Sequence, residues 1–418
     1  MNASRIWNRC EELARYSEQT DALTRIFLSP EQAQASACVA AWMREAGMQV
    51  RSDALGNVIG RYEGLQPGAP CLLLGSHLDT VRNAGKYDGM LGVVVAIECV
   101  AELHARAQRL PFAIEVIGFS DEEGVRFGST LLGSRAVAGN FDLAALDVRD
   151  RDGISMREAM LAAGLDPTKI GTAAYRAGEV LAYAELHIEQ GPVLEAEGLA
   201  LGVVTAINGF SRRRVTLRGR AGHAGTVPMG LRRDALAAAA ECVLLIERVA
   251  SAEPDLVGTV GRLETLPGAI NVIPGEVRFT MDVRAPEDAQ RLRAITAMDA
   301  GMRALCAARQ IEFEVETLQQ TPVARCAPWL MQQLEQAMRD HGCALRRLPS
   351  GAGHDGMAMV NLTDICMLFV RCKGGISHHP DEAITEADAA LSAQVLLRFI
   401  EQFDPALAGD GNAVKAGA

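Results

Sequence analysis

The sequence predicts an α/β fold with a mixed, largely parallel sheet and flanking helices, plus an inserted ferredoxin-like α+β domain. Two observations predict the large domain: apolar runs alternate with helical patterns, and polar side chains follow the ends of these runs. A third predicts the insertion, because residues 209–321 follow the order β-α-β-β-α-β. The large domain is therefore expected at residues 1–208 and 322–418.

The elements of the large domain follow from its apolar patterns. Short apolar runs predict buried strands at residues 71–78, 112–120, 180–188 and 365–372. Helical patterns follow at residues 90–107, 129–139 and within 386–403. Thr385 and Asp388 resemble a capping box that begins the last helix. The small, polar residues 405–418 are expected to fray.

The inserted domain has its own sequence of elements. Alternating patterns predict strands at residues 212–219, 256–264, 276–285 and 311–318. Helical patterns lie between them, at residues 234–250 and 288–310. This order leaves an edge strand that an identical chain can extend by antiparallel pairing, so a homodimer through this domain is expected.

Composition excludes several classes of protein. The chain has 418 residues and a net charge of −11, which argues against a general nucleic-acid binder. No window approaches the roughly 18 to 20 apolar residues of a membrane span, and the N-terminus lacks the apolar core of a signal peptide. Ten cysteines without a C-x-x-C pair indicate reduced thiols and a cytoplasmic protein.

Four predicted strands end in groups that are costly to bury. In open α/β sheets, loops at the carboxyl ends of parallel strands gather at one rim, where ligands bind. Imidazole and carboxylate groups together suit Zn²⁺, Mn²⁺ or a similar divalent ion, and even five ligands from the six side chains at this rim exceed the needs of one tetrahedral site. The side chains delivered to this rim are those of His77, Asp88, Glu122, Glu123, His187 and His378.

Each of these residues has an ordinary alternative explanation. A single histidine after a strand is more often a hydrogen-bonded surface group, and an acidic pair such as Glu122 and Glu123 is usually a solvated loop. Three of only eight histidines, however, close separate apolar runs beside carboxylates. Asp79 lies two residues after His77, so on an extended strand both face one way and Asp79 is expected to orient the imidazole.

The motifs HLDTV, DEEG, HIEQGP, GHAGTVPM, GAINVIPG and GISHHPDE resemble those of the M20 metallopeptidase superfamily. HIEQGP is typical of its ureido-amide branch, which contains allantoate amidohydrolases, N-carbamoyl-L-amino-acid hydrolases and β-ureidopropionases. M20 peptidases of the aminopeptidase type generally carry a carboxylate at the position of His187. The resemblance covers roughly residues 23–403, and the motifs occur in the family's order.

The resemblance implies two divalent ions, Mn²⁺ or Zn²⁺, and a role for each rim residue. His77 and His187 would bind one ion, Glu123 and His378 the other, and Asp88 would bridge them. Relatives usually have asparagine where this chain has His379. His378 is the expected ligand because it directly follows the GIS turn.

The resemblance also assigns the chemistry. Glu122 would be the general base that takes a proton from the attacking water and passes it to the departing nitrogen. His223, from the partner subunit, would stabilise the negative charge of the tetrahedral intermediate. The substrate would be held by Gln190, Arg212, Asn271 and Arg284, with Arg284 and Asn271 on its carboxylate.

These roles imply a small anionic ureido substrate. The segments LTRIFLSPEQ and SGAGHDGMAM look most like allantoate amidohydrolases, which favours conversion of allantoate to ureidoglycine, ammonia and carbon dioxide. Hydrolysis of N-carbamoyl-L-amino acids or of β-ureidopropionate is the alternative within the branch. A catalytically silent, metal-stabilised binding protein is the alternative from another class, and Glu122 argues against it. His354 and Asp355 are expected near the site without an assigned role.

Overall fold

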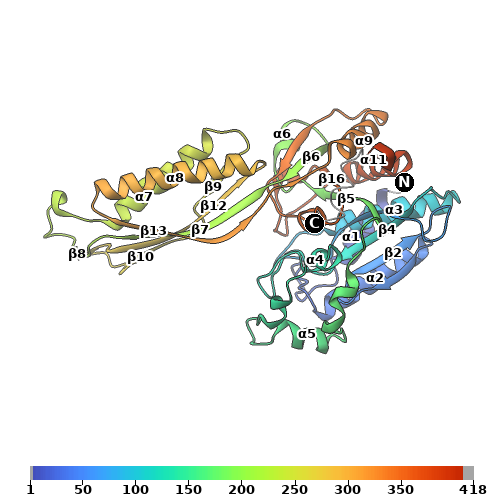
Figure 1. The fold of residues 1–418 in the computed structure, drawn as a ribbon, viewed down its shortest axis with the longest axis horizontal. Helices are drawn as coiled ribbons and strands as arrows, with labels where there is room; N and C mark the ends of the chain where they lie inside the picture. Colours follow the sequence, from blue (N-terminus) through green and yellow to red (C-terminus); the bar gives the residue numbers. More distant parts are fainter. Residues whose placement is uncertain (1–2, 408–418) are drawn as a thin grey trace. The chain divides into compact units, whose positions relative to one another are not determined.

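The computed structural model describes residues 3–407, so most of the tail expected to fray lies outside the described residues. The chain divides into two compact units (Figure 1). Among the described residues, unit 1 contains 3–205, 325–348 and 352–407. Unit 2 contains Ala206–Ala324 and Pro349–Gly351.

A nine-stranded sheet is the largest of the three sheets formed by residues 3–407. Its main path runs in the order β1-β2-β4-β3-β5-β16-β6-β14, and β15 pairs with β6. The strands are β1 (Gln49–Ser52), β2 (Val58–Tyr62), β3 (Cys71–His77), β4 (Ala113–Phe119), β5 (Val180–Ile188), β6 (Leu201–Ile207), β14 (Ala324–Arg325), β15 (Arg347–Ser350) and β16 (Ile365–Val370).

The centre of this sheet is parallel, which confirms the predicted fold class. Strands β4, β3, β5 and β16 lie side by side and pair in parallel, whereas β1, β2 and β6 pair antiparallel with their neighbours. Every residue of β3, β4 and β16 is buried, as expected for parallel strands covered on both faces. All four parallel strands therefore end at the same rim.

Helices cover this sheet. The largely buried α3 packs on β3, β4 and β5, and α11 packs on α3 and β16. The α-helices of unit 1 are α1 (Ala3–Leu13), α2 (Pro30–Glu45), α3 (Met90–Ala105), α4 (Leu132–Val137), α5 (Met156–Ala162), α6 (Val193–Ala196), α9 (Pro328–Asp340), α10 (Gly356–Met359) and α11 (Glu386–Gln402). Short 3₁₀ turns lie at Leu143–Asp147, Pro167–Ala173 and Lys373–Gly375.

Two local expectations differ from the structure. The helix expected at residues 129–139 is shorter, because Leu131 takes a left-handed conformation with φ 63° and α4 begins after it. Thr385 caps α11 by accepting a hydrogen bond from the Asp388 backbone N–H. The Asp388 carboxylate does not complete the capping box but pairs with Arg371 instead.

Unit 2 contains a second sheet with the order β10-β12-β7-β13, and β9 pairs with β12. Helices α7 and α8 pack on it, and apolar residues of both helices form a core with β7 and β12. A separate pair of short strands joins β8 to β11. The elements are β7 (Gly209–Arg218), β8 (Gly222–His223), the 3₁₀ turn Met229–Leu231, α7 (Ala235–Ser251), β9 (Val257–Thr259), β10 (Leu263–Leu266), β11 (Val272–Ile273), β12 (Glu276–Ala285), α8 (Asp288–Ala308) and β13 (Glu312–Thr321).

The single strand expected at residues 256–264 is divided into β9 and β10. Between them the ladder is interrupted, and Arg262 pairs with Thr280 through its backbone N–H to the Thr280 hydroxyl and through its carbonyl to the Thr280 N–H. An alternating pattern continues across such an irregularity, because it records which face each side chain takes and not which backbone groups pair.

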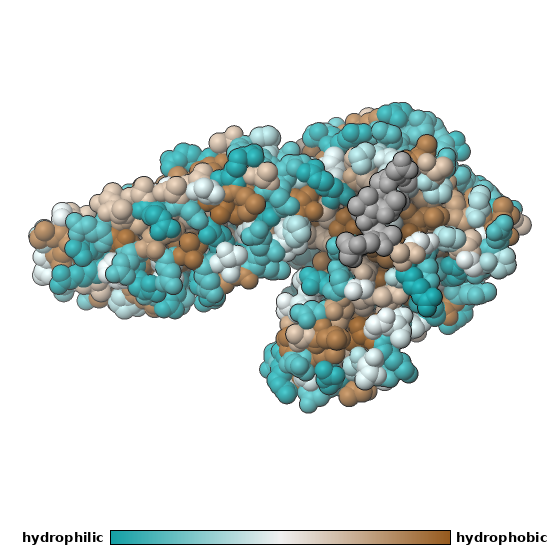
Figure 2. All heavy atoms as spheres, viewed as in Figure 1, coloured by the Kyte–Doolittle hydropathy of each residue, from teal (hydrophilic) through white to brown (hydrophobic). Residues whose placement is uncertain are grey.

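The face of the molecule shown in Figure 2 is largely polar. Hydrophilic residues predominate on the face shown in Figure 2, and hydrophobic residues form smaller patches between them. Across the described part of the chain, no helix combines the length and the apolar character needed to cross a membrane.

Candidate metal centre

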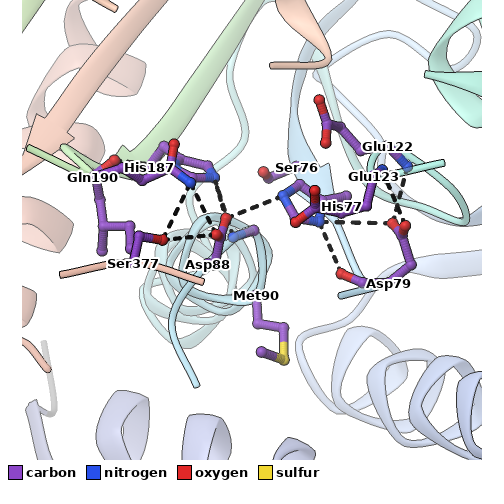
Figure 3. A network of polar contacts seen from close by, with 12 residues as sticks. Ser76, His77, Asp79, Asp88, Met90, Glu122, Glu123, His187, Gln190 and Ser377 are labelled. Carbon is purple, nitrogen blue, oxygen red and sulfur yellow. Dashed lines mark hydrogen bonds and ion pairs between the residues drawn. The ribbon is translucent and has the colours of Figure 1, made fainter. Parts of the chain in front are cut away.

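The four central strands bring the predicted rim residues together (Figure 3). His77 is the last residue of β3, and His187 is the penultimate residue of β5. Glu122 and Glu123 follow the end of β4, and His378 lies in the loop after β16. Residues as far apart in the sequence as His77 and His378, 301 positions, thus share one rim, because adjacent parallel strands end on the same side.

Asp88 lies at the centre of this group. Its Oδ1 is 3.4 Å from His77 Nε2 and 3.1 Å from His187 Nε2. Its Oδ2 is 3.2 Å from His378 Nε2, which is itself 3.5 Å from Glu123 Oε1. Each oxygen of Asp88 therefore faces a different set of possible ligands, an arrangement suited to a carboxylate shared by two ions.

The Asp88 loop needs glycine to approach His77 closely. Gly89 has φ 72°, a backbone conformation that L side chains rarely adopt. A Cβ atom added there would collide with the His77 ring. Helix α3 begins directly after this glycine, so the tight turn also fixes where the helix starts.

The electrostatics of the site follow from buried carboxylates beside imidazoles. Burial opposes ionisation of Asp88, but hydrogen bonds from His187, His378 and His77 outweigh it and hold the pKa of Asp88 well below its usual range. Burial lowers the pKa of His187, but the Asp88 carboxylate more than offsets this and the pKa is raised. Burial raises the pKa of Glu122 to about 7, with repulsion from neighbouring acids adding to the effect.

This donor set fits divalent ions. Two groups of three residues place their possible ligand atoms within 4.8 Å of one another: His77, Asp88 and His187, and Asp88, Glu123 and His378. A third group contains His77, Glu122 and Glu123. Nitrogen and oxygen donors of this kind suit Zn²⁺ or Mn²⁺. Burial, and then repulsion from Glu122 and Asp88, raises the pKa of Glu123 well above normal. A bound cation would offset this repulsion among the buried acids.

Asp79 has a wider role than the one expected from its spacing. Its backbone carbonyl, 2.9 Å from His77 Nδ1, is closer to the imidazole than its carboxylate oxygen, which lies at 3.6 Å. The carboxylate accepts hydrogen bonds from the backbone N–H groups of Glu122, at 3.0 Å, and Glu123, at 3.1 Å. Asp79 thus orients His77 mainly through its main chain, while its side chain fixes the turn that carries both glutamates.

Gln190, expected at the substrate, contacts the carboxylate at the centre of the site. Its Nε2 donates to Asp88 Oδ2 at 2.9 Å and to Ser377 Oγ at 3.2 Å. Its Oε1 is buried and has no hydrogen-bond partner among the described residues. Gln190 and His378 both have φ 56°, so two residues at the rim adopt the left-handed backbone conformation that is uncommon outside glycine.

Glu382 and Ser377 are functional candidates that the sequence did not reveal. The Glu382 side chain accepts hydrogen bonds from the backbone N–H groups of Tyr87, at 2.9 Å, and Asp88, at 3.1 Å. Its other oxygen is 2.9 Å from Ser377 Oγ, which also lies 2.9 Å from Asp88 Oδ2. Glu382 therefore joins the loop that carries Asp88 to the loop that carries His378. Its place in the PDE segment after the two histidines was the available signal.

The structure distinguishes the two adjacent histidines. His378 faces Asp88 and Glu123, whereas the side chain of His379 is 58 % exposed and its Nδ1 accepts a hydrogen bond from the backbone N–H of Asp381. His354 is buried, with its ring centroid 4.4 Å from that of His187 in an edge-to-face contact. Its place is therefore beside a possible ligand.

The remaining predicted residues lie in unit 2. His223 and Asn271 are both exposed and adjoin the β8–β11 pair, where His223 is opposite Val272 and Ala224 donates to the Asn271 carbonyl. Arg212 and Arg284, from β7 and β12, both bind the Asp282 carboxylate. The structure thus brings these four residues together as two pairs.

The comparisons with known proteins agree with this arrangement. Residues 73–402 match the sequence profile of Peptidase family M20/M25/M40. The chain belongs to this family. The matched span includes the possible metal ligands of the rim, which we call the metal cluster: His77, Asp88, Glu122, Glu123, His187 and His378.

Relatives match this M20 chain over nearly its full length. It is 42 % identical to an N-carbamoyl-L-amino acid amidohydrolase of Geobacillus stearothermophilus, over 96 % of this chain and 98 % of that protein. It is also 42 % identical to a probable allantoate deiminase of Oryza sativa subsp. japonica, over 94 % and 87 % of the two chains. The crystal structure of an amidase of the hydantoinase/carbamoylase family from Burkholderia multivorans superposes with a TM-score of 0.90 at 33 % identity, over 96 % and 97 %.

Proposed function

We propose that the chain hydrolyses allantoate, releasing ureidoglycine, ammonia and carbon dioxide. More generally, it is an M20 hydrolase of C–N bonds, and its relatives support a metal-dependent ureido amidohydrolase. The observation that carries the hydrolase part of the proposal is the position of Asp88, whose Oδ1 lies 3.1 Å from His187 Nε2 and whose Oδ2 lies 3.2 Å from His378 Nε2. Buried Glu122 lies beside this group.

The ions would be held by the two groups that share Asp88: His77 and His187 on one side, Glu123 and His378 on the other. Bound divalent ions acidify water and polarise a carbonyl group. Glu122 takes the proton of the attacking water and delivers it to the departing nitrogen. A carboxyl group whose pKa is raised to about 7 by burial suits both steps near neutral pH.

Two segments favour allantoate. The LTRIFLSPEQ segment packs against the loop after β3, where Arg25 donates through Nε to the Leu78 carbonyl and through its backbone N–H to Thr80 Oγ1. The SGAGHDGMAM segment places His354 against His187. Both segments resemble allantoate amidohydrolases, and both adjoin residues next to the proposed ligands.

N-carbamoyl-L-amino acids are the second candidate substrates. The relative from Geobacillus stearothermophilus, which is named for that activity, is as similar to this chain as the probable allantoate deiminase. Both substrate classes combine a ureido carbonyl with a carboxylate, so the metal cluster alone does not favour either of them.

A substrate panel tests the proposal. Metal-loaded protein is given allantoate, N-carbamoyl-L-alanine, N-carbamoyl-β-alanine or a dipeptide, and the release of ammonia or of free amino acid is measured. Allantoate should show the highest kcat/KM, and the Glu122→Gln variant supplies the background for every substrate. A preference for N-carbamoyl-L-alanine would replace allantoate with the second candidate, and cleavage of the dipeptide alone would refute both.

We also propose that the protein is a homodimer in which unit 2 supplies His223 and Asn271 to the partner's site. Exposed apolar side chains near these residues support an interface: Met229 is 77 % exposed, Leu231 76 % and Ile270 fully so. Strand β13 ends the main path of the unit 2 sheet and is available for pairing.

A further inference from the structure

A charged cluster on unit 2 contains one carboxylate between two arginines. We call Phe210, Arg212, Asp282 and Arg284 the Asp282 cluster. Arg284 binds Asp282 with both arms of its fork, Nε to Oδ1 at 3.0 Å and Nη2 to Oδ2 at 2.9 Å. Arg212 Nε binds the same Oδ2 at 3.2 Å. Two guanidinium groups thus share a single internal carboxylate.

The positions of these side chains follow from the strands. Asp282 on β12 is directly opposite Arg212 on β7, and Arg284 is opposite Phe210. Alternate residues of a strand share a face, so all four side chains project from the same side of the sheet. The guanidinium carbons of Arg212 and Arg284 lie 4.7 Å and 5.6 Å from the Phe210 ring centroid, so both cations are within reach of the same aromatic ring.

The Nη1 groups of both arginines also donate hydrogen bonds. Arg284 Nη1 donates to the Gly351 carbonyl at 2.9 Å, and Arg212 Nη1 donates to Gln319 Oε1 at 3.1 Å. The three charged residues of the cluster, Arg212, Asp282 and Arg284, line a cavity of about 570 Å³ that is also bordered by Val257, Thr259, Leu318 and Gly351. The side chain of Asp282 is 27 % exposed, so the cluster is open to a ligand.

The charge of the cluster distinguishes it from the two ion pairs formed by the neighbouring arginines of β7, Arg213 and Arg214. Arg213 is matched one to one with Asp299, and Arg214 with Glu316. The Asp282 cluster instead has two positive charges and one negative charge, a net charge of +1. Burial raises the pKa of Asp282, but the hydrogen bonds and charges of Arg284 and Arg212 together outweigh it, so the pKa is lowered and this carboxylate is ionised at neutral pH.

We infer that Asp282 is a specificity-determining residue: it sets the net charge of an anion site formed by Arg212 and Arg284, so that the site selects ligands with a single carboxylate. The inference rests on the proposed function, which supplies a ureido acid with one carboxylate as the ligand. Asp282 has two effects. It holds both guanidinium groups in place, and it neutralises one of their two charges.

Removing this carboxylate should favour ligands with a second negative charge. Asp282→Asn keeps the size of the side chain and one oxygen acceptor but raises the net charge of the cluster to +2. One additional unit charge about 6 Å from the second carboxylate, at an effective dielectric of about 40, corresponds to roughly a tenfold change in affinity. The affinity for a ligand with one carboxylate should rise less, because the single charge of that ligand is already matched by the net charge of the wild-type cluster.

The test is binding of succinate and of succinamate, which have nearly the same size and differ by one negative charge. Calorimetry on the metal-loaded full chain at low ionic strength gives the ratio of the two affinities. In Asp282→Asn the ratio should shift toward succinate by about tenfold. Arg212→Gln, which lowers the charge of the cluster, should shift it toward succinamate.

Two variants act as controls. Glu316→Gln removes one acid from the same face of the sheet, where Glu316 pairs with Arg214, and should leave the ratio within about twofold of wild type. Arg284→Gln should weaken the binding of both succinate and succinamate, which would identify the cluster as the place where they bind. Carboxylate binding by the metal cluster is common to all variants, so it contributes equally to each comparison.

The inference is overturned if Asp282→Asn leaves the ratio unchanged, or if Glu316→Gln shifts it equally. It is also overturned if Arg284→Gln leaves both affinities unchanged. A merely structural role for Asp282 would lower the thermal midpoint without moving the ratio. Binding is measured without turnover, so a failure of the proposed ureido hydrolysis is recognised separately, in the substrate panel.

Discussion

Replacement of Glu382 tests how the site is held together. Glu382→Ala would leave the backbone N–H groups of Tyr87 and Asp88 without their acceptor in a buried place. Each unpaired buried N–H costs about 1–3 kcal/mol, or about 2–6 kcal/mol for the pair. We expect the loop of the metal-free variant to open and expose these groups to water, whereas bound ions would hold Asp88 in place. The cost should therefore appear largely in metal affinity.

Glu382→Gln separates the hydrogen bonds from the charge. The amide oxygen can still accept from both backbone N–H groups, and the amide nitrogen can donate to Ser377 Oγ. Ser377 then keeps its single hydroxyl proton for Asp88 Oδ2, 2.9 Å away. We expect the dissociation constant for Mn²⁺ or Zn²⁺ to rise by about 10² in Glu382→Ala and by less than about tenfold in Glu382→Gln.

Competition with a chromogenic chelator measures these constants. Asp381→Ala is the matched control, because the side chain of Asp381 is 76 % exposed in the same loop and its removal should leave metal affinity near that of wild type. Wild-type affinity in Glu382→Ala would refute the reasoning, as would an equal loss in the alanine and glutamine variants.

Three further expectations concern the chemistry of the site. Glu122→Gln should lower kcat by at least ~10² in the ammonia-release assay with metal content unchanged. If metal and activity are lost in parallel, Glu122 is the metal ligand and Glu123 the general base. Mixing inactive Glu122→Gln and His223→Ala chains should restore part of the activity, whereas no recovery despite demonstrated subunit exchange would place the site within one chain. Metal affinity should fall as the pH falls, because the pKa values of His187 and His378 are raised and protons then occupy the nitrogens that must bind metal. Calorimetry between pH 5 and 8 measures this dependence, and an affinity that does not change with pH would contradict it.

The rim of the sheet was predictable from the sequence, because its signal is local. Each of His77, His187 and the Glu122–Glu123 pair stands at or just after an apolar run, and parallel strands must end on the same side. The β-α-β-β-α-β order of the insertion was visible for the same reason, since alternating and helical patterns are read from neighbouring residues.

The supporting contacts were not predictable, because they join distant parts of the chain. Glu382 binds Asp88 across 294 positions, and no pattern near either residue indicates that pairing. Asp282 reads as an ordinary alternating strand position, and only the register of β12 with β7 places it between two arginines. The Asp79 carboxylate was expected at His77, but the turn after β4 presents two backbone N–H groups to it.

The central claim is that Asp88 is shared by two ions that act together in hydrolysis. Titration of metal-free protein with Mn²⁺ or Zn²⁺, with bound metal and allantoate-dependent ammonia release followed on the same samples, tests it most directly. Activity of the wild-type protein should rise to a plateau at two ions per chain. The His378→Ala variant should bind only one ion and should show no activity at any metal concentration. A plateau at one ion per chain, with His378→Ala fully active, would contradict the claim.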